Sequence, residues 1–214
     1  NKMYITTDGI SSLANNFNER PKSLPAPVVK LGTINFTGEI SGFFDNLVAF
    51  GKLSSSIGSI QTDLIFGSNK DKNIAAYLRG RIASSNLRLH ELFGENNPFG
   101  EARFDINIDT RRPVGGNFSG NIQAQVKEFD YKAYKYKDIN LSGNFRKSSF
   151  DGTIHVDDPN GELHAQGIFQ HQGQNSLFNF TARLDHFRPD RLNLTDKYLS
   201  LIHISEPTRP RLIS

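Results

Sequence analysis

Cysteine, tryptophan and long hydrophobic runs are all absent from this chain of 214 residues. Without cysteine no disulfide can form, and the sequence carries no mark of an oxidising or reducing compartment. No segment approaches the roughly 20 consecutive apolar residues of a membrane-spanning helix. The residues around Met3, the only methionine, lack the charged-then-apolar layout of a signal peptide. The formal net charge of +3 is too small to indicate a polyanionic partner.

Glycine, in contrast, recurs in a fixed pattern in which a hydrophobic residue stands two positions before it and another two positions after it. Copies begin at Phe36, Leu78, Phe118, Leu141 and Phe150, and a looser copy begins at Ala165. Because successive side chains of a strand point to opposite faces, each copy places its apolar residues and its glycine on one face. The sequence therefore predicts an all-β fold: a curled, mostly antiparallel meander sheet with an open apolar groove.

Turn residues and proline divide the chain into three parts. Residues 1–27 are predicted as a short helical and proline-rich segment, with a helix near residues 7–14. Residues 28–198 are predicted as the repetitive β-sheet segment, with a single helical turn at 87–94 and hairpin turns at 111–116 and 157–161. The last of these turns is rich in oxygen ligands but lacks the acid spacing of a calcium loop, so a plain turn is the preferred interpretation.

The end of the sequence differs from the rest. Residues 199–209 read LSLIHISEPTR, which resembles the conceptual translation of an adapter used in sequencing libraries. We interpret residues 199–214 as such an artefact and exclude them from the fold prediction. We expect the chain to be an internal fragment of a longer protein, with its natural start missing.

Three histidines are the candidates for a metal site. His155, His164 and His171 fall on or near neighbouring strands, and His155 is expected almost opposite His164 across the turn at 157–161. No suitably spaced third ligand or carboxylate is evident, so polar residues on the solvent-facing side of a hairpin are the preferred interpretation. We therefore predict no metal site and no cofactor.

Signals for nucleic-acid binding and for catalysis are weak. The run at residues 127–137 interleaves lysine with aromatic residues, but Glu128 and Asp130 oppose phosphate binding, and a solvated strand explains the same composition. The sequence contains no nucleophile elbow, phosphate loop, paired carboxylates or zinc helix. We predict no nucleic-acid partner, no catalytic residue and no enzymatic activity.

Several segments together resemble a known family. They are residues 31–42, 53–60, 87–94, 134–143 and 150–161. In this order along the chain they are similar to the TamB branch of the AsmA-like proteins, and the likeness covers most of residues 11–198. The resemblance implies a periplasmic protein that is anchored in the inner membrane by an N-terminal helix missing from this fragment. It also implies a TamA-like outer-membrane barrel partner and a curled β-taco sheet enclosing an apolar groove. Inner-to-outer membrane phospholipid transport and outer-membrane protein assembly or secretion are the implied functions.

The apolar residues of the repeats are then candidates for sheltering phospholipid acyl chains. Each buried methylene contributes about 0.8 kcal/mol, so many weak contacts can hold a lipid without one dominant residue. The candidate groove residues are Ile34, Phe36, Ile40, Leu64, Phe66, Leu78, Ile82, Phe104, Ile106, Ile108, Phe118, Ile122, Val126, Leu141, Phe145, Ile154, Val156, Phe178 and Phe180.

A structural β-sandwich or adhesin-like interaction module is the alternative. In a sandwich, two apolar faces pack against each other and the polar surface binds a protein or a glycan. The absence of tryptophan and the presence of 17 phenylalanines favour the open sheet over this alternative, but sequence separates the two only in part.

Overall fold

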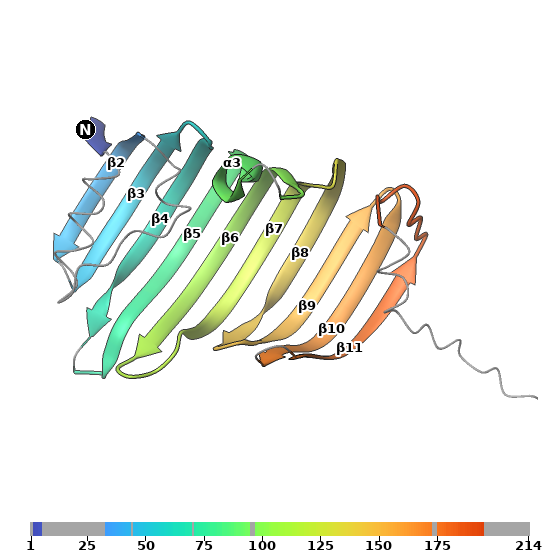
Figure 1. Cartoon of the computed structure of the whole chain (residues 1–214). Coiled ribbons are helices and arrows are strands. Elements are labelled where there is room, and N and C mark those ends of the chain that lie inside the picture. Colours follow the sequence, from blue (N-terminus) through green and yellow to red (C-terminus); the bar gives the residue numbers. More distant parts are fainter. Residues whose placement is uncertain are drawn as a thin grey trace, which may run out of the picture.

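The described residues of this computed structural model form one antiparallel β-sheet (Figure 1). They are residues 2–5, 33–43, 45–69, 71–94, 97–172 and 175–194. The order of the 11 strands in space is their order along the chain, so each strand pairs with its neighbours in sequence. The predicted all-β antiparallel meander is confirmed.

The strands are longest in the middle of the sheet, where β5 and β6 each have 15 residues. A short helix, α3, follows β5 directly. In chain order the elements are β1 (Lys2–Ile5), β2 (Ile34–Phe43), β3 (Asn46–Ser55), β4 (Gly58–Asn69), β5 (Ile74–Arg88), α3 (Leu89–Phe93), β6 (Phe99–Pro113), β7 (Ser119–Tyr131), β8 (Tyr134–Arg146), β9 (Ser149–Asp158), β10 (Gly161–Gln172) and β11 (Asn175–Asp185).

Alternation along the strands separates apolar from polar side chains, as β6 illustrates. Ile106 lies opposite Ile82 of β5 and Ala124 of β7, so apolar residues of three strands share one face. On the other face Arg81 Nε donates a hydrogen bond to Asp105 Oδ1 at 2.7 Å. This bond from the guanidinium lowers the pKa of the Asp105 carboxyl. The sheet consequently has one apolar and one polar face.

The turn between β9 and β10 is held by its own aspartate. Gly161 lies opposite Asp158, and the buried Asp158 carboxylate accepts hydrogen bonds from the backbone N–H groups of Asn160 (2.9 Å) and Lys137 (3.0 Å). The Tyr134 hydroxyl donates to the same carboxylate. These bonds satisfy a carboxylate that would otherwise be costly to bury. The interpretation of residues 157–161 as a hairpin turn is confirmed.

Two further local predictions agree with the structure. The turn at residues 111–116 joins β6 to β7. The helical turn expected at 87–94 is α3, although residues 87 and 88 still belong to β5. This helix ends where the Gly94 N–H donates to the His90 carbonyl at 2.8 Å.

The first residues depart from the expected helical segment. Lys2–Ile5 form β1, which pairs with β2 so that Met3 lies opposite Phe36. Four residues carry too little alternation to be recognised as a strand, and their partner lies about 30 residues further along the chain. The helix predicted near residues 7–14 and the tail at 199–214 lie outside the described residues.

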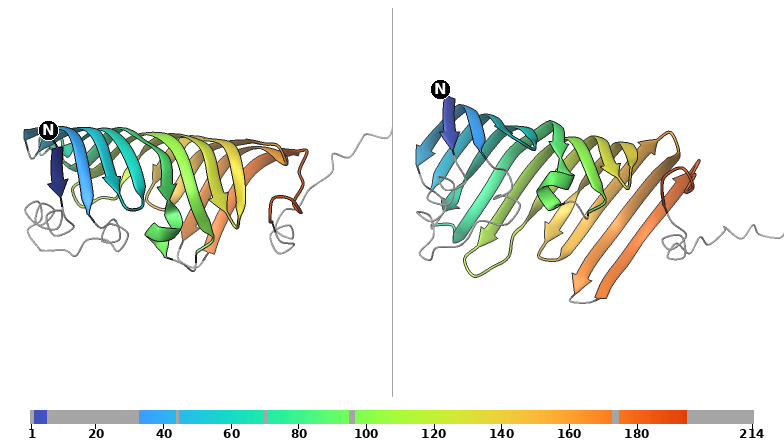
Figure 2. Two further views of the ribbon diagram at one scale, coloured as in Figure 1. Left: turned by 90° about the horizontal axis from the view of Figure 1, so that it is seen from above. Right: turned by 45° about the horizontal axis from the view of Figure 1, so that its top comes forward.

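The expected curl into an enclosing groove is not found. The sheet is open and uncurled, and Figure 2 shows β1 and β11 at its two opposite ends. The described residues provide one sheet, so they do not pack two sheets together as the sandwich alternative requires. No helix in this part of the chain has the length and apolar character needed to cross a membrane.

Few side chains of the described residues are fully buried, as expected for a single layer. The buried hydrophobic residues are Ile34, Phe36, Ile57, Leu87, Ala102, Ala124 and Leu192.

Candidate functional site

The apolar face of the sheet is the candidate functional site. One row of side chains crosses it perpendicular to the strands, from β5 to β10: Ile82, Ile106, Ala124, Leu141, Ile154 and Ala165. The register brings every predicted groove residue onto positions of this face except Phe118, which lies exposed directly before β7. For Phe178 the structure describes the strand position only. Alternation in the sequence was therefore sufficient to assign the face.

Most of this face is not covered by other described residues. Among the predicted groove residues whose side chains the structure describes, only Ile34 and Phe36 are buried. Ile40, Phe66 and Phe180 retain 46%, 37% and 56% of their accessible surface, and most of the others are half-buried. A contiguous apolar surface of this kind marks a site of interaction with protein or lipid.

Some glycines of the repeat lie beside phenylalanine rings on the apolar face. Gly38 lies opposite Gly51, and a methyl group added at either would come within 2.9 Å of Phe36 Cζ. At a second pair, Gly143 opposite Gly152, an added methyl group would lie 2.6 or 2.8 Å from Phe150 Cζ. At these two pairs a side chain would clash with neighbouring backbone and with a phenylalanine ring, so glycine allows a close approach. The inward bend that the sequence interpretation assigned to the glycines is not found, because the sheet is uncurled.

At one end of the apolar face, aromatic side chains pack together. The ring centroid of Phe99 lies 5.7 Å from that of Phe93 on α3, 5.8 Å from that of Phe129 and 5.6 Å from that of Tyr131. These separations are typical of favourable aromatic pairs. The aromatic residues of the run at 127–137 are half-buried, which corrects the interpretation of that run as a solvated strand.

The segment after β11 covers the same end. The Tyr136 hydroxyl donates to the Leu192 carbonyl at 2.7 Å, and Asn193 Nδ2 donates to the Lys132 carbonyl at 2.8 Å. Leu192 is buried, and burial raises the pKa of Tyr136. We call this region the capped end; it comprises Leu87, Phe93, Phe99, Ala102, Phe129, Tyr131, Tyr134, Tyr136, Asp158 and Leu192.

The polar face is hollowed but is not suited to lipid tails. A hollow of about 1040 Å³ is lined by polar side chains of β5 to β10, including Arg79, Arg146, Asp109 and Asp151. Arg79 Nε lies 2.9 Å from Asp109 Oδ1, so opposite charges are already paired within it. Mixed charge and polar walls make this hollow unsuitable for acyl chains.

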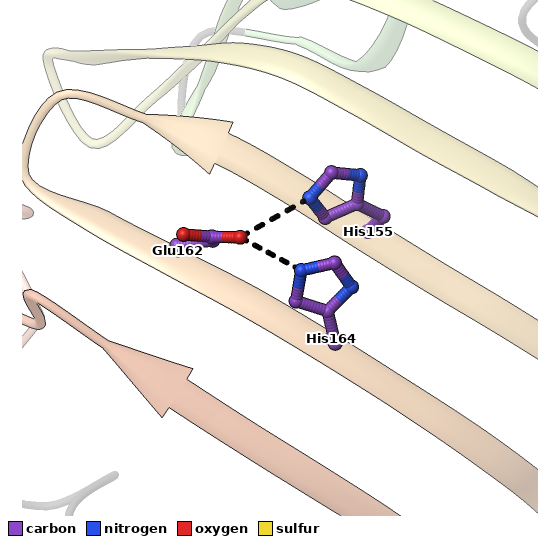
Figure 3. A group of neighbouring side chains, drawn as sticks. All are labelled: His155, Glu162 and His164. Carbon is purple, nitrogen blue, oxygen red and sulfur yellow. Dashed lines mark hydrogen bonds and ion pairs between the residues drawn. The ribbon is translucent and has the colours of Figure 1, made fainter.

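A second constellation, on the polar face, brings together two imidazoles and a carboxylate (Figure 3). His155 of β9 lies directly opposite His164 of β10, as the sequence predicted. Glu162 stands two residues before His164 and lies on the same face. A carboxylate therefore does accompany the histidines, contrary to the sequence interpretation. The spacing Glu-x-His within one strand was the signal that identifies it. His171 is not part of this group.

Comparisons with known proteins give no relative for this chain: no protein family, curated protein or solved structure matches it.

Proposed function

We propose that this segment shelters phospholipid acyl chains on its apolar face. In this proposal it belongs to a periplasm-spanning protein of the TamB/AsmA-like kind that supports inner-to-outer membrane lipid transport and outer-membrane protein assembly or secretion. The inner-membrane anchor and the contact with a TamA-like barrel are assigned to parts of that protein outside this sequence. The observation that carries the proposal is the uncovered apolar face, on which Ile40, Phe66 and Phe180 remain exposed.

The dimensions of the sheet suit this role. Strands of 15 residues, at about 3.3 Å per residue, span about 50 Å, and neighbouring strands are about 4.8 Å apart. One leaflet of a bilayer has a hydrocarbon thickness of about 15 Å, half the core of about 30 Å. An extended acyl chain would therefore cover only three or four strands, and the face has room for more than one chain.

The chemistry of the face suits a fluid ligand. It offers aliphatic and phenyl groups without a convergent set of polar groups. It can therefore bind acyl chains by burying them but cannot distinguish one phospholipid headgroup from another. Each methylene removed from water contributes about 0.8 kcal/mol, which favours chains of many methylenes over small apolar molecules. Headgroups would remain in water at the open side of the sheet.

The test is native mass spectrometry of the whole chain after expression in a bacterial periplasm, looking for co-purified phospholipid. Two pairs of matched variants separate the faces. Phe66→Asn and Ile40→Asn alter the apolar face, whereas Phe50→Asn and Ile65→Asn alter apolar residues that are 62% and 40% exposed on the polar face. Loss of lipid is expected in the first pair only, with circular dichroism unchanged in all four.

Two results would overturn the proposal. One is a folded chain that carries no lipid and takes none from phospholipid vesicles. The other is an equal loss of lipid in both pairs of variants. A lipid-free chain that forms a concentration-dependent dimer through the apolar face would instead favour the interaction module.

A further inference from the structure

We propose that His155, Glu162 and His164 bind one divalent transition-metal ion of the zinc class. This site lies on the polar face, and the inference is independent of the role proposed for the apolar face. It depends on three side chains from the β9–β10 hairpin that converge on a common point (Figure 3).

The distances between the ligand atoms are close to those around a bound ion. Glu162 Oε1 lies 2.8 Å from His164 Nε2 and 3.8 Å from His155 Nε2, and all the ligand atoms lie within 4.8 Å of one another. With bonds of about 2.0–2.2 Å, a tetrahedral zinc ion holds its ligand atoms roughly 3.4 Å apart. Side-chain rotations that move the ligand atoms by about 1 Å reach that geometry. Two imidazoles and one carboxylate are also the donor set that zinc accepts in proteins.

The backbone fixes the arrangement before any ion arrives. His155 and His164 are directly opposed in the antiparallel register, and their rings stack with centroids 3.9 Å apart and an angle of 16° between planes. Glu162 lies on the same face as His164 because it stands two residues before it in β10. A preformed site loses less conformational entropy on binding than one assembled from loops.

The electrostatics of the group favour a cation between its members. His155 Nε2 is shielded from solvent and has no hydrogen-bond partner, although it faces Glu162 Oε1. A metal ion placed between the three side chains would give this nitrogen a partner, because it would accept lone pairs from His155 Nε2, His164 Nε2 and the Glu162 carboxylate. Any proton held on a ligand nitrogen is released when the ion binds.

Neighbouring charged groups contribute net negative potential. Glu162 is opposed by Asp157 on β9 and by Asp185 on β11, whereas His164 is opposed by Arg183. Arg183 Nε donates a hydrogen bond to Asp185 Oδ2 at 2.7 Å, so the positive charge of Arg183 is paired with that carboxylate. On β8 the residue opposite His155 is the neutral Asn140. The partial exposure of Glu162 and His164 leaves a fourth position open for water.

The test is titration of the chelator-treated whole chain with zinc chloride, followed by isothermal calorimetry and native mass spectrometry. One zinc ion per chain is expected, with no response to magnesium, because magnesium prefers oxygen ligands. His155→Gln, His164→Gln and Glu162→Gln should each weaken binding at least tenfold. His90→Gln is the matched control, since His90 Nε2 also lies 3.8 Å from a glutamate, Glu91, but has no second imidazole beside it.

A second measurement needs no variant and so does not depend on how the variants fold. In long-range nitrogen-proton spectra, zinc should shift the imidazole signals of His155 and His164 and leave that of His90 unchanged. No bound zinc, zinc that shifts only other histidines, or affinity unchanged in the three variants would each overturn the proposal. Any of these results would leave the group as a stacked histidine pair with a hydrogen bond between His164 and Glu162.

Discussion

The capped end and the open remainder of the apolar face have the same alternation of residues and very different surroundings. At the capped end Leu87 keeps 7% of its accessible surface, Phe93 of α3 packs on Phe99, and the segment after β11 bonds to Tyr136. Elsewhere Ile34 and Phe36 are buried at the start of β2, but Ile40 of the same strand keeps 46%. Stability is therefore expected to be concentrated where the sheet is covered, whereas the uncovered part is available to bind a partner. The alternation of apolar and polar residues in the sequence identifies the apolar face but not what covers it.

The largest expected difference in the free energy of unfolding is between variants at one buried and one exposed aliphatic residue of this face. Leu87→Ala should lower the free energy of unfolding by about 3 kcal/mol, because it removes buried methylenes and leaves a cavity. Ile40→Ala should cost only about 1 kcal/mol, since that side chain is already half in water. Urea denaturation followed by circular dichroism measures both. Equal losses would show that the two regions are covered to the same extent.

The next largest effect on stability concerns the buried carboxylate of Asp158 at the capped end. Asp158→Ala leaves the Tyr134 hydroxyl and the N–H groups of Lys137 and Asn160 without their acceptor, which should cost about 2 kcal/mol. Asp157→Ala changes the preceding, exposed carboxylate and should stay within about 0.5 kcal/mol of the parent chain. Hydrogen exchange at the Lys137 amide should become faster in the first variant only. Similar losses in the two variants would contradict a structural role for Asp158.

Much of the sheet could be predicted from sequence because it depends on local rules. Alternation placed the groove candidates on one face, and the turn residues at 157–161 placed His155 opposite His164. Both follow from the two-residue repeat of a strand and from hairpin geometry. Glu162 follows the same rules, because the two-residue repeat places it on the face of His164, although the sequence interpretation did not include it.

The features that escaped prediction depend on contacts between distant parts of the chain. Tyr136 is 56 residues from Leu192, whose carbonyl it contacts, and Tyr134 is 24 residues from Asp158. No local pattern encodes such pairs. The surroundings of the glycines escaped for a related reason: the sequence indicates a missing side chain, but only the structure shows that Phe36 and Phe150 lie beside it.

The smallest expected effect tests the polar face and depends on pH. The hydrogen bond from Arg81 lowers the pKa of Asp105, so the pair stabilises the fold above the ordinary aspartate value of about 3.9 and loses this contribution as the pH falls through the lowered value. Both side chains are partly exposed to solvent, which keeps the contribution small. Arg81→Gln should therefore lower the urea midpoint slightly near neutral pH and leave it unchanged at a pH about 2 units below 3.9. A midpoint difference that is the same at both pH values would mean that Arg81 acts through packing of its side chain. The polar face would then contribute to stability in the same way as the apolar face, instead of through charge.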